Sequence, residues 1–210
     1  MMAKPAFERF GMVALLALVL APLHAAEKID SSTPQKLIET SSTALLENLD
    51  ANRAAYRKDI TGLYKVIDSE FLPHVDVPYA ARQVLGKHWR DATPEQKKRF
   101  TDALYQSLLT TYGKALLDFT SDQMKVLPSQ DDASATGSTV RTKIRTSNGT
   151  DVAVNYRLRK VDGEWKVWDV VIEGISYVGS FRDDFGTEID QKGLEALLKR
   201  LESGQLKAAG

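Results

Sequence analysis

The chain has 210 residues, with 28 basic and 28 acidic side chains, three histidines and no cysteine. This length fits one domain or two small ones, and a formal net charge of zero argues against a nucleic-acid-binding protein. Without cysteine there is no disulfide, no thiolate nucleophile and no cysteine-bound zinc site.

The first 26 residues have the layout of a secretory signal peptide. Lys4 and Arg9 provide a positive start, residues 11–21 form an uninterrupted apolar run, and the small pair Ala25-Ala26 precedes the first acidic residue of the following segment. A membrane-spanning helix needs about 20 apolar residues, so this run is too short for an anchor. We therefore expect cleavage near Ala26 and export of a mature chain of residues 27–210, with the exact bond left open.

The next part of the chain, about residues 30–120, has the patterns of helices. Thr33-Pro34 is a helix start, with proline in the first turn, and an apolar stripe follows it. A second helical pattern covers residues 59–72, and a third begins near Asp76 and ends at Gly86.

A longer helix is predicted from the signal Thr93-Pro94-Glu95-Gln96, in which Thr93 and Gln96 occupy the positions of a capping box. The apolar stripe that follows runs from Phe100 to Phe119. Gly113 lies inside this stripe at a small cost in helix propensity. It marks either a bend or a close approach by another part of the chain.

From about residue 121 to 175 the pattern changes to an alternation of period two, which is typical of strands. Strands are predicted at residues 123–127, 139–147, 151–161 and 165–172, and Asn148-Gly149 and Asp162-Gly163 have the composition of hairpin turns. Two helices follow at about residues 179–204. This order predicts an α+β domain with an antiparallel meander of about four strands.

The register of the meander follows from the faces on which its side chains gather, because a one-residue slip reverses every side chain. This reasoning predicts a loop of odd length at Asn148-Gly149. With three residues in the loop, Ile144 lies opposite Val154 and one face of the sheet is apolar. The same reasoning aligns the even-numbered residues of 152–156 with those of 168–172. The opposite face then carries basic residues, with Asp169 as a counter-charge: Arg141, Lys143, Arg145, Arg157 and Arg159.

Catalytic patterns are weak. His74 and Asp76 form the best acid–base pair, because a carboxylate can orient and charge an imidazole. They lie between two prolines, where polar loop residues are expected. No histidine and carboxylate spacing suits a metal. A small exported enzyme that uses His74 and Asp76 remains the alternative hypothesis.

The apolar sheet face and the amphipathic helices form either a filled core or a cavity wall, and periodicity alone favours the filled core. Several segments, however, resemble the MlaC or toluene-tolerance family of periplasmic phospholipid-binding proteins, and the resemblance covers about residues 30–202. These segments are Val84 to Phe100, Tyr156-Arg157-Leu158-Arg159 with Trp165, Trp168 to Val178, and Phe181-Arg182 with Phe185 and Gly193-Leu194.

The resemblance implies a non-enzymatic carrier in the periplasm, without a cofactor, whose cargo is phospholipid. It implies movement of lipid between the outer and inner membranes and maintenance of outer-membrane lipid asymmetry, with the direction of movement left open. The implied partners are an inner-membrane ABC transporter with an MCE-domain subunit and an outer-membrane lipoprotein–porin complex.

We expect residues 27–210 to form a single lipid-binding domain whose sheet and helices enclose a hydrophobic cavity. The predicted wall of the cavity combines strand and helix residues: Val154, Tyr156, Trp168, Val170, Ile172, Phe71, Leu104, Leu108, Tyr112, Phe181 and Phe185.

Overall fold

The computed structural model describes residues 29–120, 123–128, 136–146 and 149–206. The predicted signal peptide lies outside these ranges. Among the helices of the described residues, none combines the length and the apolar character that crossing a bilayer requires.

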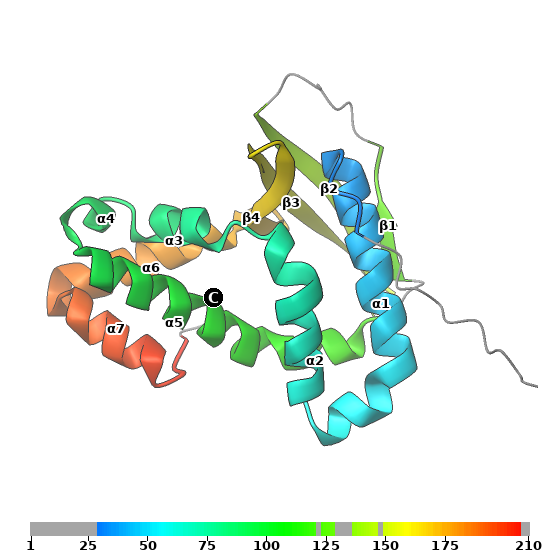
Figure 1. Ribbon diagram of the computed structural model, residues 1–210, viewed down its shortest axis with the longest axis horizontal. Helices are drawn as coiled ribbons and strands as arrows, with labels where there is room; N and C mark the ends of the chain where they lie inside the picture. The colour runs from blue at the N-terminus through cyan, green and yellow to red at the C-terminus, as the bar shows by residue number, and fades with distance from the viewer. Residues whose placement is uncertain (1–28, 121–122, 129–135, 147–148, 207–210) are drawn as a thin grey trace, which may run out of the picture.

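The N-terminal half of the described chain is helical, as predicted (Figure 1). Its elements are α1 (Pro34–Lys58), α2 (Thr61–Val66), the π-helix η1 (Ile67–Phe71), the 3-10 helix η2 (Leu72–His74), α3 (Val77–Leu85), α4 (His88–Asp91), α5 (Pro94–Tyr112) and the 3-10 helix η3 (Gly113–Asp118).

The predicted helix starts are confirmed by their caps. The Thr33 side chain accepts a hydrogen bond from the Lys36 backbone N–H at the start of α1. At the start of α5 both bonds of the capping box are present. Thr93 Oγ1 accepts from the Gln96 N–H at 3.2 Å, and Gln96 Oε1 accepts from the Thr93 N–H at 2.9 Å. Each cap pairs backbone groups that the first helical turn leaves unsatisfied.

Two of the predicted helices change their winding. The helix expected at residues 59–72 is α-helical only to Val66 and continues as η1 and η2. The long stripe is α-helical to Tyr112 and continues as η3 from Gly113. A Cβ at Gly113 would lie 2.7 Å from Cε1 of Tyr64, so the change in winding and a close approach coincide at this glycine.

The sheet is an antiparallel meander in the order β1-β2-β3-β4-β5, which confirms the predicted α+β fold class. Four of the strands correspond to the predicted ones, and the two-residue β5 was not predicted. The strands are β1 (Met124–Val126), β2 (Gly137–Arg145), β3 (Asp151–Val161), β4 (Glu164–Ile172) and β5 (Ile175–Ser176). The chain then forms α6 (Tyr177–Lys192) and α7 (Leu194–Glu202).

The loop between β2 and β3 has odd length, as predicted, but it is longer than three residues. Arg145 pairs with Asp151, and Ile144 therefore lies opposite Val152 instead of Val154. The loop is closed by the Thr146 N–H, which donates to the Thr150 carbonyl at 2.9 Å. This shift of two residues changes the partners but keeps the predicted faces.

The pairing of β3 with β4 contains a β-bulge that the alternation did not predict. Tyr156 pairs with Val170, and Arg157 pairs with Asp169, but Leu158 pairs with Val167. Trp168 is thus the extra residue of β4. The prediction that Trp168 lies in regular register with Val170 and Ile172 is wrong, because a bulge interrupts the alternation of the strand.

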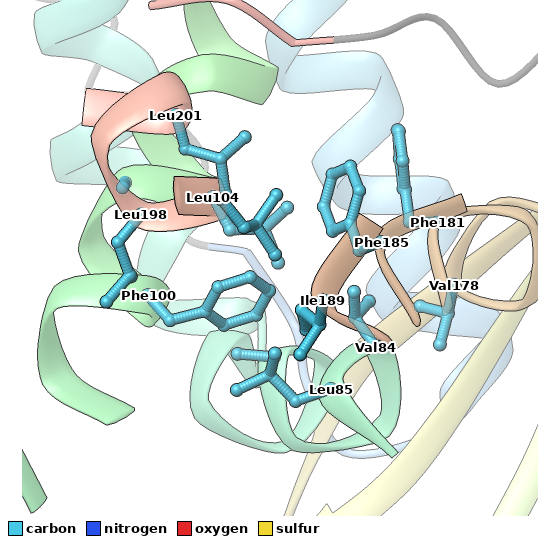
Figure 2. Close-up of a cluster of buried hydrophobic side chains, with 13 residues drawn as sticks. Val84, Leu85, Phe100, Leu104, Val178, Phe181, Phe185, Ile189, Leu198 and Leu201 are labelled. Carbon is cyan, nitrogen blue, oxygen red and sulfur yellow. The ribbon is translucent and has the colours of Figure 1, made fainter. Parts of the chain in front are cut away.

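The largest core cluster lies among α3, α5, α6 and α7 (Figure 2). Phe100 and Phe185 meet edge to face with their ring centroids 6.2 Å apart. Figure 1 shows these helices on one side of the molecule and α1 along the sheet on the other. In a second cluster, Leu37 and Ile38 of α1 pack on Val140, Leu158 and Trp165.

Candidate functional site

An apolar cavity lies between α1, η3 and one face of the sheet. Its volume is about 110 Å³, which exceeds the roughly 10–15 Å³ that one water molecule needs on a comparable measure. Polar side chains of Ser42, Thr120 and Gln123 contribute part of the lining. The apolar lining residues are Leu45, Leu46, Leu49, Leu116, Phe119, Met124, Ile144 and Tyr156.

Tyr156 is the residue that both the sequence and the structure assign to this cavity. It lies deep in the protein, and burial raises the pKa of its hydroxyl to about 12. Its side chain nevertheless keeps part of its surface accessible, because the ring lines the cavity.

Three of the other predicted strand residues, Val154, Val170 and Ile172, share the sheet face of Tyr156. Val154 pairs with Ile172, and Tyr156 pairs with Val170. Val154 is buried, whereas Val170 and Ile172 are half-buried. The sheet thus brings four predicted residues together, and their contact with a ligand stays a prediction.

Three of the predicted helix residues lie in the helical core. Leu104, Phe181 and Phe185 are at most 2% exposed and pack against other protein side chains (Figure 2). They are not among the residues that line the cavity. A filled core and a cavity wall have the same periodicity, so the sequence did not separate them.

The remaining predicted residues are partly buried. Leu108, Tyr112 and Trp168 are partly buried against the helical cluster. Tyr112 meets Tyr177 with their ring centroids 6.0 Å apart, and burial raises the pKa of Tyr112. Phe71 is half-buried at the end of η1. Half-buried aromatic side chains of this kind can contact a ligand without any change in the core.

Sequence reasoning missed most residues that line the cavity. Leu45 and Leu49 were visible in the stripe of α1, and Leu116 and Phe119 in the stripe that ends in η3. Ile144 was placed on the correct sheet face. The missing information was which helix covers that face, and periodicity does not contain it.

The opposite face of the sheet is basic, and Asp169 is its buried counter-charge, as predicted. Asp169 Oδ2 accepts from Nη1 of Arg157 at 3.0 Å and from Oγ of Ser176 at 2.7 Å. Asp169 Oδ1 accepts from the Val178 N–H at 3.1 Å. Because Val178 is in the first turn of α6, one carboxylate joins β3, β4 and the start of this helix.

The alternative catalytic pair is engaged in structural contacts. Asp76 caps α3 by accepting from the Tyr79 N–H at 3.1 Å, and it forms an ion pair with Arg159. Burial lowers the pKa of His74. Within the described part of the chain, His74 and Asp76 share no hydrogen bond or ion pair, so this arrangement gives no support to acid–base catalysis.

Across the described ranges, no group of three or more histidine, aspartate or glutamate side chains is arranged to hold a metal ion. The fold and the cavity together define the class. This is an α+β protein in which helices and an antiparallel sheet enclose an apolar cavity, lined mainly by leucine and aromatic side chains.

The chain belongs to the MlaC protein family, whose family model matches residues 39–203. It is 32% identical over 186 residues to the toluene tolerance protein ttg2D of Pseudomonas putida, covering 88% of this chain and 84% of that protein. It is 22% identical over 177 residues to the intermembrane phospholipid transport system binding protein MlaC of Haemophilus influenzae, covering 83% of each chain. The predicted family is therefore confirmed.

The fold is similar to that of a solved phospholipid-binding protein from Ralstonia solanacearum, determined in complex with a phospholipid. The TM-score is 0.74 at 24% sequence identity, and the match covers 83% of this chain and 97% of that one. At this identity the likeness establishes the common fold.

Proposed function

We propose that this protein is a periplasmic phospholipid carrier that holds acyl tails in the cavity between α1, η3 and the sheet. The single observation that carries the proposal is the apolar cavity of about 110 Å³ on the face of Tyr156. Membership of the MlaC family supports it. Two further findings support the proposal. The Haemophilus influenzae relative is named for a phospholipid transport system, and the Ralstonia solanacearum protein was determined with a bound phospholipid.

The need for such a cavity follows from the cost of exposing hydrocarbon to water. Two acyl tails with about 30 methylenes, at ~0.8 kcal/mol each, give roughly 24 kcal/mol. Free diffusion of a phospholipid across an aqueous compartment is therefore negligibly slow. A carrier replaces the bilayer with a protein wall, and release then depends on partners that bind the loaded and the empty states differently.

The cavity has to widen during loading, because ligand pockets usually measure about 300–1,000 Å³. We propose that η1 and η2 allow this widening. Neither element contributes a buried side chain, and weakly buried segments open at low free-energy cost. Phe71, at the junction of these two elements, then becomes a residue that contacts the tails. The four predicted strand residues on the face of Tyr156 form the opposite wall.

The finer parts of the proposal concern the cellular task. Residues 27–210 act as one exported domain that moves phospholipid between the outer and inner membranes and so maintains lipid asymmetry of the outer membrane. The expected partners are the ABC transporter with its MCE-domain subunit and the outer-membrane lipoprotein–porin complex. A transport-system relative supports this assignment.

The test is to purify the protein without added lipid, denature it, extract it with organic solvent and analyse the extract by mass spectrometry. We expect phospholipid in near-stoichiometric amount. The His74→Ala variant serves as a control and retains the same lipid occupancy. Reproducible absence of phospholipid from the folded protein contradicts the proposal. A large loss of function in His74→Ala without loss of fold supports the enzyme alternative.

A further inference from the structure

A groove lies on the outer face of the sheet, beside α3. Its volume is about 750 Å³. Side chains alternate between the two faces of a strand, so Arg157 and Arg159 lie on the face opposite Tyr156 and the apolar cavity. The lining includes Tyr79, Thr139, Arg157, Arg159, Lys160 and Trp168.

Both arginines are held in place by a carboxylate and an aromatic ring. Arg157 donates through Nη1 to Asp169, whose side chain is fully buried, and its guanidinium lies 5.9 Å from the ring centroid of Trp168. Arg159 donates through Nη1 to Asp76, and its guanidinium lies 4.3 Å from the ring centroid of Tyr79. The bulge at Trp168 is what brings this ring to the side of Arg157.

These contacts leave donor groups available. A guanidinium carries five N–H donors. The side chains of Arg157 and Arg159 remain 43% and 35% exposed, respectively, within the groove. Thr139 pairs with Arg157 across the strands and adds a hydroxyl group. The side chains therefore present oriented N–H and hydroxyl donors to one space.

We propose that this groove binds a phosphate-ester or phosphate anion. Residues two apart on a strand are separated by about 7 Å, a spacing at which two guanidiniums can donate to one tetrahedral anion placed between them. The planar fork of arginine suits phosphate oxygens, with which it forms paired hydrogen bonds. Because Asp169 and Asp76 already hold the guanidiniums, binding requires little additional ordering of side chains. The same carboxylates offset the formal charge of the two guanidiniums, so the affinity is moderate and sensitive to salt.

Two sources of this chemistry are distinguished by the choice of probe. Inorganic phosphate represents the free anion, and sn-glycerol 3-phosphate represents a water-soluble part of a phospholipid head group. Each is titrated at low ionic strength into the isotope-labelled full protein, and the NMR signals of the Trp168 indole and the arginine side chains are followed. Saturable shifts are expected, whereas acetate at the same ionic strength produces none. Tighter binding of the glycerol ester assigns the groove to a head group, and equal binding assigns it to free phosphate.

The variant test compares two arginines of the same sheet face. Arg159→Gln is expected to weaken binding by at least about tenfold, because it removes charged hydrogen bonds. Arg145→Gln is the matched control, since it breaks an exposed ion pair with Asp151 outside the groove. The affinity of this variant for the phosphate probes should stay within about twofold of the native value, because exposed pairs contribute little. Circular dichroism establishes that both variants fold. If Arg159→Gln unfolds, Thr139→Val replaces it, with a smaller expected loss, because it removes a hydroxyl donor from the lining of the groove.

The proposal is overturned if the native protein gives only a linear, unsaturated response to both phosphate probes. It is also overturned if Arg145→Gln weakens binding as much as the groove variant does. The groove and the cavity lie on opposite faces of the sheet, so a failure here leaves the extraction test of the carrier function unaffected.

Discussion

Replacing Ile144 with tryptophan tests whether the cavity holds acyl tails. Ile144 lines the cavity from β2 and is half-buried, and tryptophan is well accepted in strands. If the larger ring displaces about three methylenes of a tail, at ~0.8 kcal/mol each, the loss of binding free energy is about 2.4 kcal/mol. This corresponds to roughly 50-fold weaker retention of phospholipid.

The assay measures phospholipid per protein by mass spectrometry after extraction, together with the thermal unfolding midpoint. Lys143→Trp is the matched control, because it introduces the same ring at the next residue of β2, on the outer face. We expect Ile144→Trp to lose most of its lipid with a small change in midpoint, and Lys143→Trp to keep its lipid. Full lipid occupancy in folded Ile144→Trp refutes the assignment of the cavity. A variant that simply unfolds indicates overpacking of a filled core, which costs about 1–3 kcal/mol.

Three further predictions concern stability. In urea titrations Asp169→Ala should lower the free energy of unfolding by about 2 kcal/mol or more, because it removes three hydrogen bonds to a buried carboxylate. Asp151 is the exposed partner of an ion pair, so Asp151→Ala should lower the free energy of unfolding by less than about 1 kcal/mol in the same titrations. Equal losses in the two variants would contradict the role of burial. Phe185→Ala should cost about 3–5 kcal/mol, whereas Phe71→Ala should cost less in the same titrations and instead reduce lipid occupancy. Burial lowers the pKa of His74 from its ordinary 6.5, so the folded state disfavours the imidazolium. The contribution of neutral His74 to the free energy of unfolding is therefore fully present above pH 6.5 and is lost as the pH falls through the lowered pKa. His74→Gln should therefore flatten the pH dependence of the unfolding midpoint below 6.5, and an unchanged profile would contradict this assignment.

The sequence predicted features that depend on local chemistry. The capping box at Thr93 and Gln96 was predicted because both of its bonds join residues three positions apart. The faces of β2 and β3 were predicted because apolar residues gather on one side only. The special role of Gly113 was visible as a glycine within an apolar helical stripe, although its neighbour Tyr64 was not.

Features set by packing between distant segments were not predictable in the same way. The bulge at Trp168 changes the register after Arg157, yet the residues of β4 read as a regular strand. The same limit applies to the site. Phe181 and Tyr156 both look like apolar wall residues, but Phe181 is buried among helices while Tyr156 lines the cavity. Only the position of α1 over the sheet separates these two environments.

The bonds of Asp169 have a consequence for the order of folding. Its carboxylate accepts from both Arg157 and the Val178 N–H only when β3 is in register and the first turn of α6 has packed beside it. The β3–β4 hairpin joins neighbouring segments, and local pairing of this kind forms early. The hairpin therefore prepares the acceptor on which α6 packs, so docking of this helix completes the hydrogen bonds of the buried carboxylate.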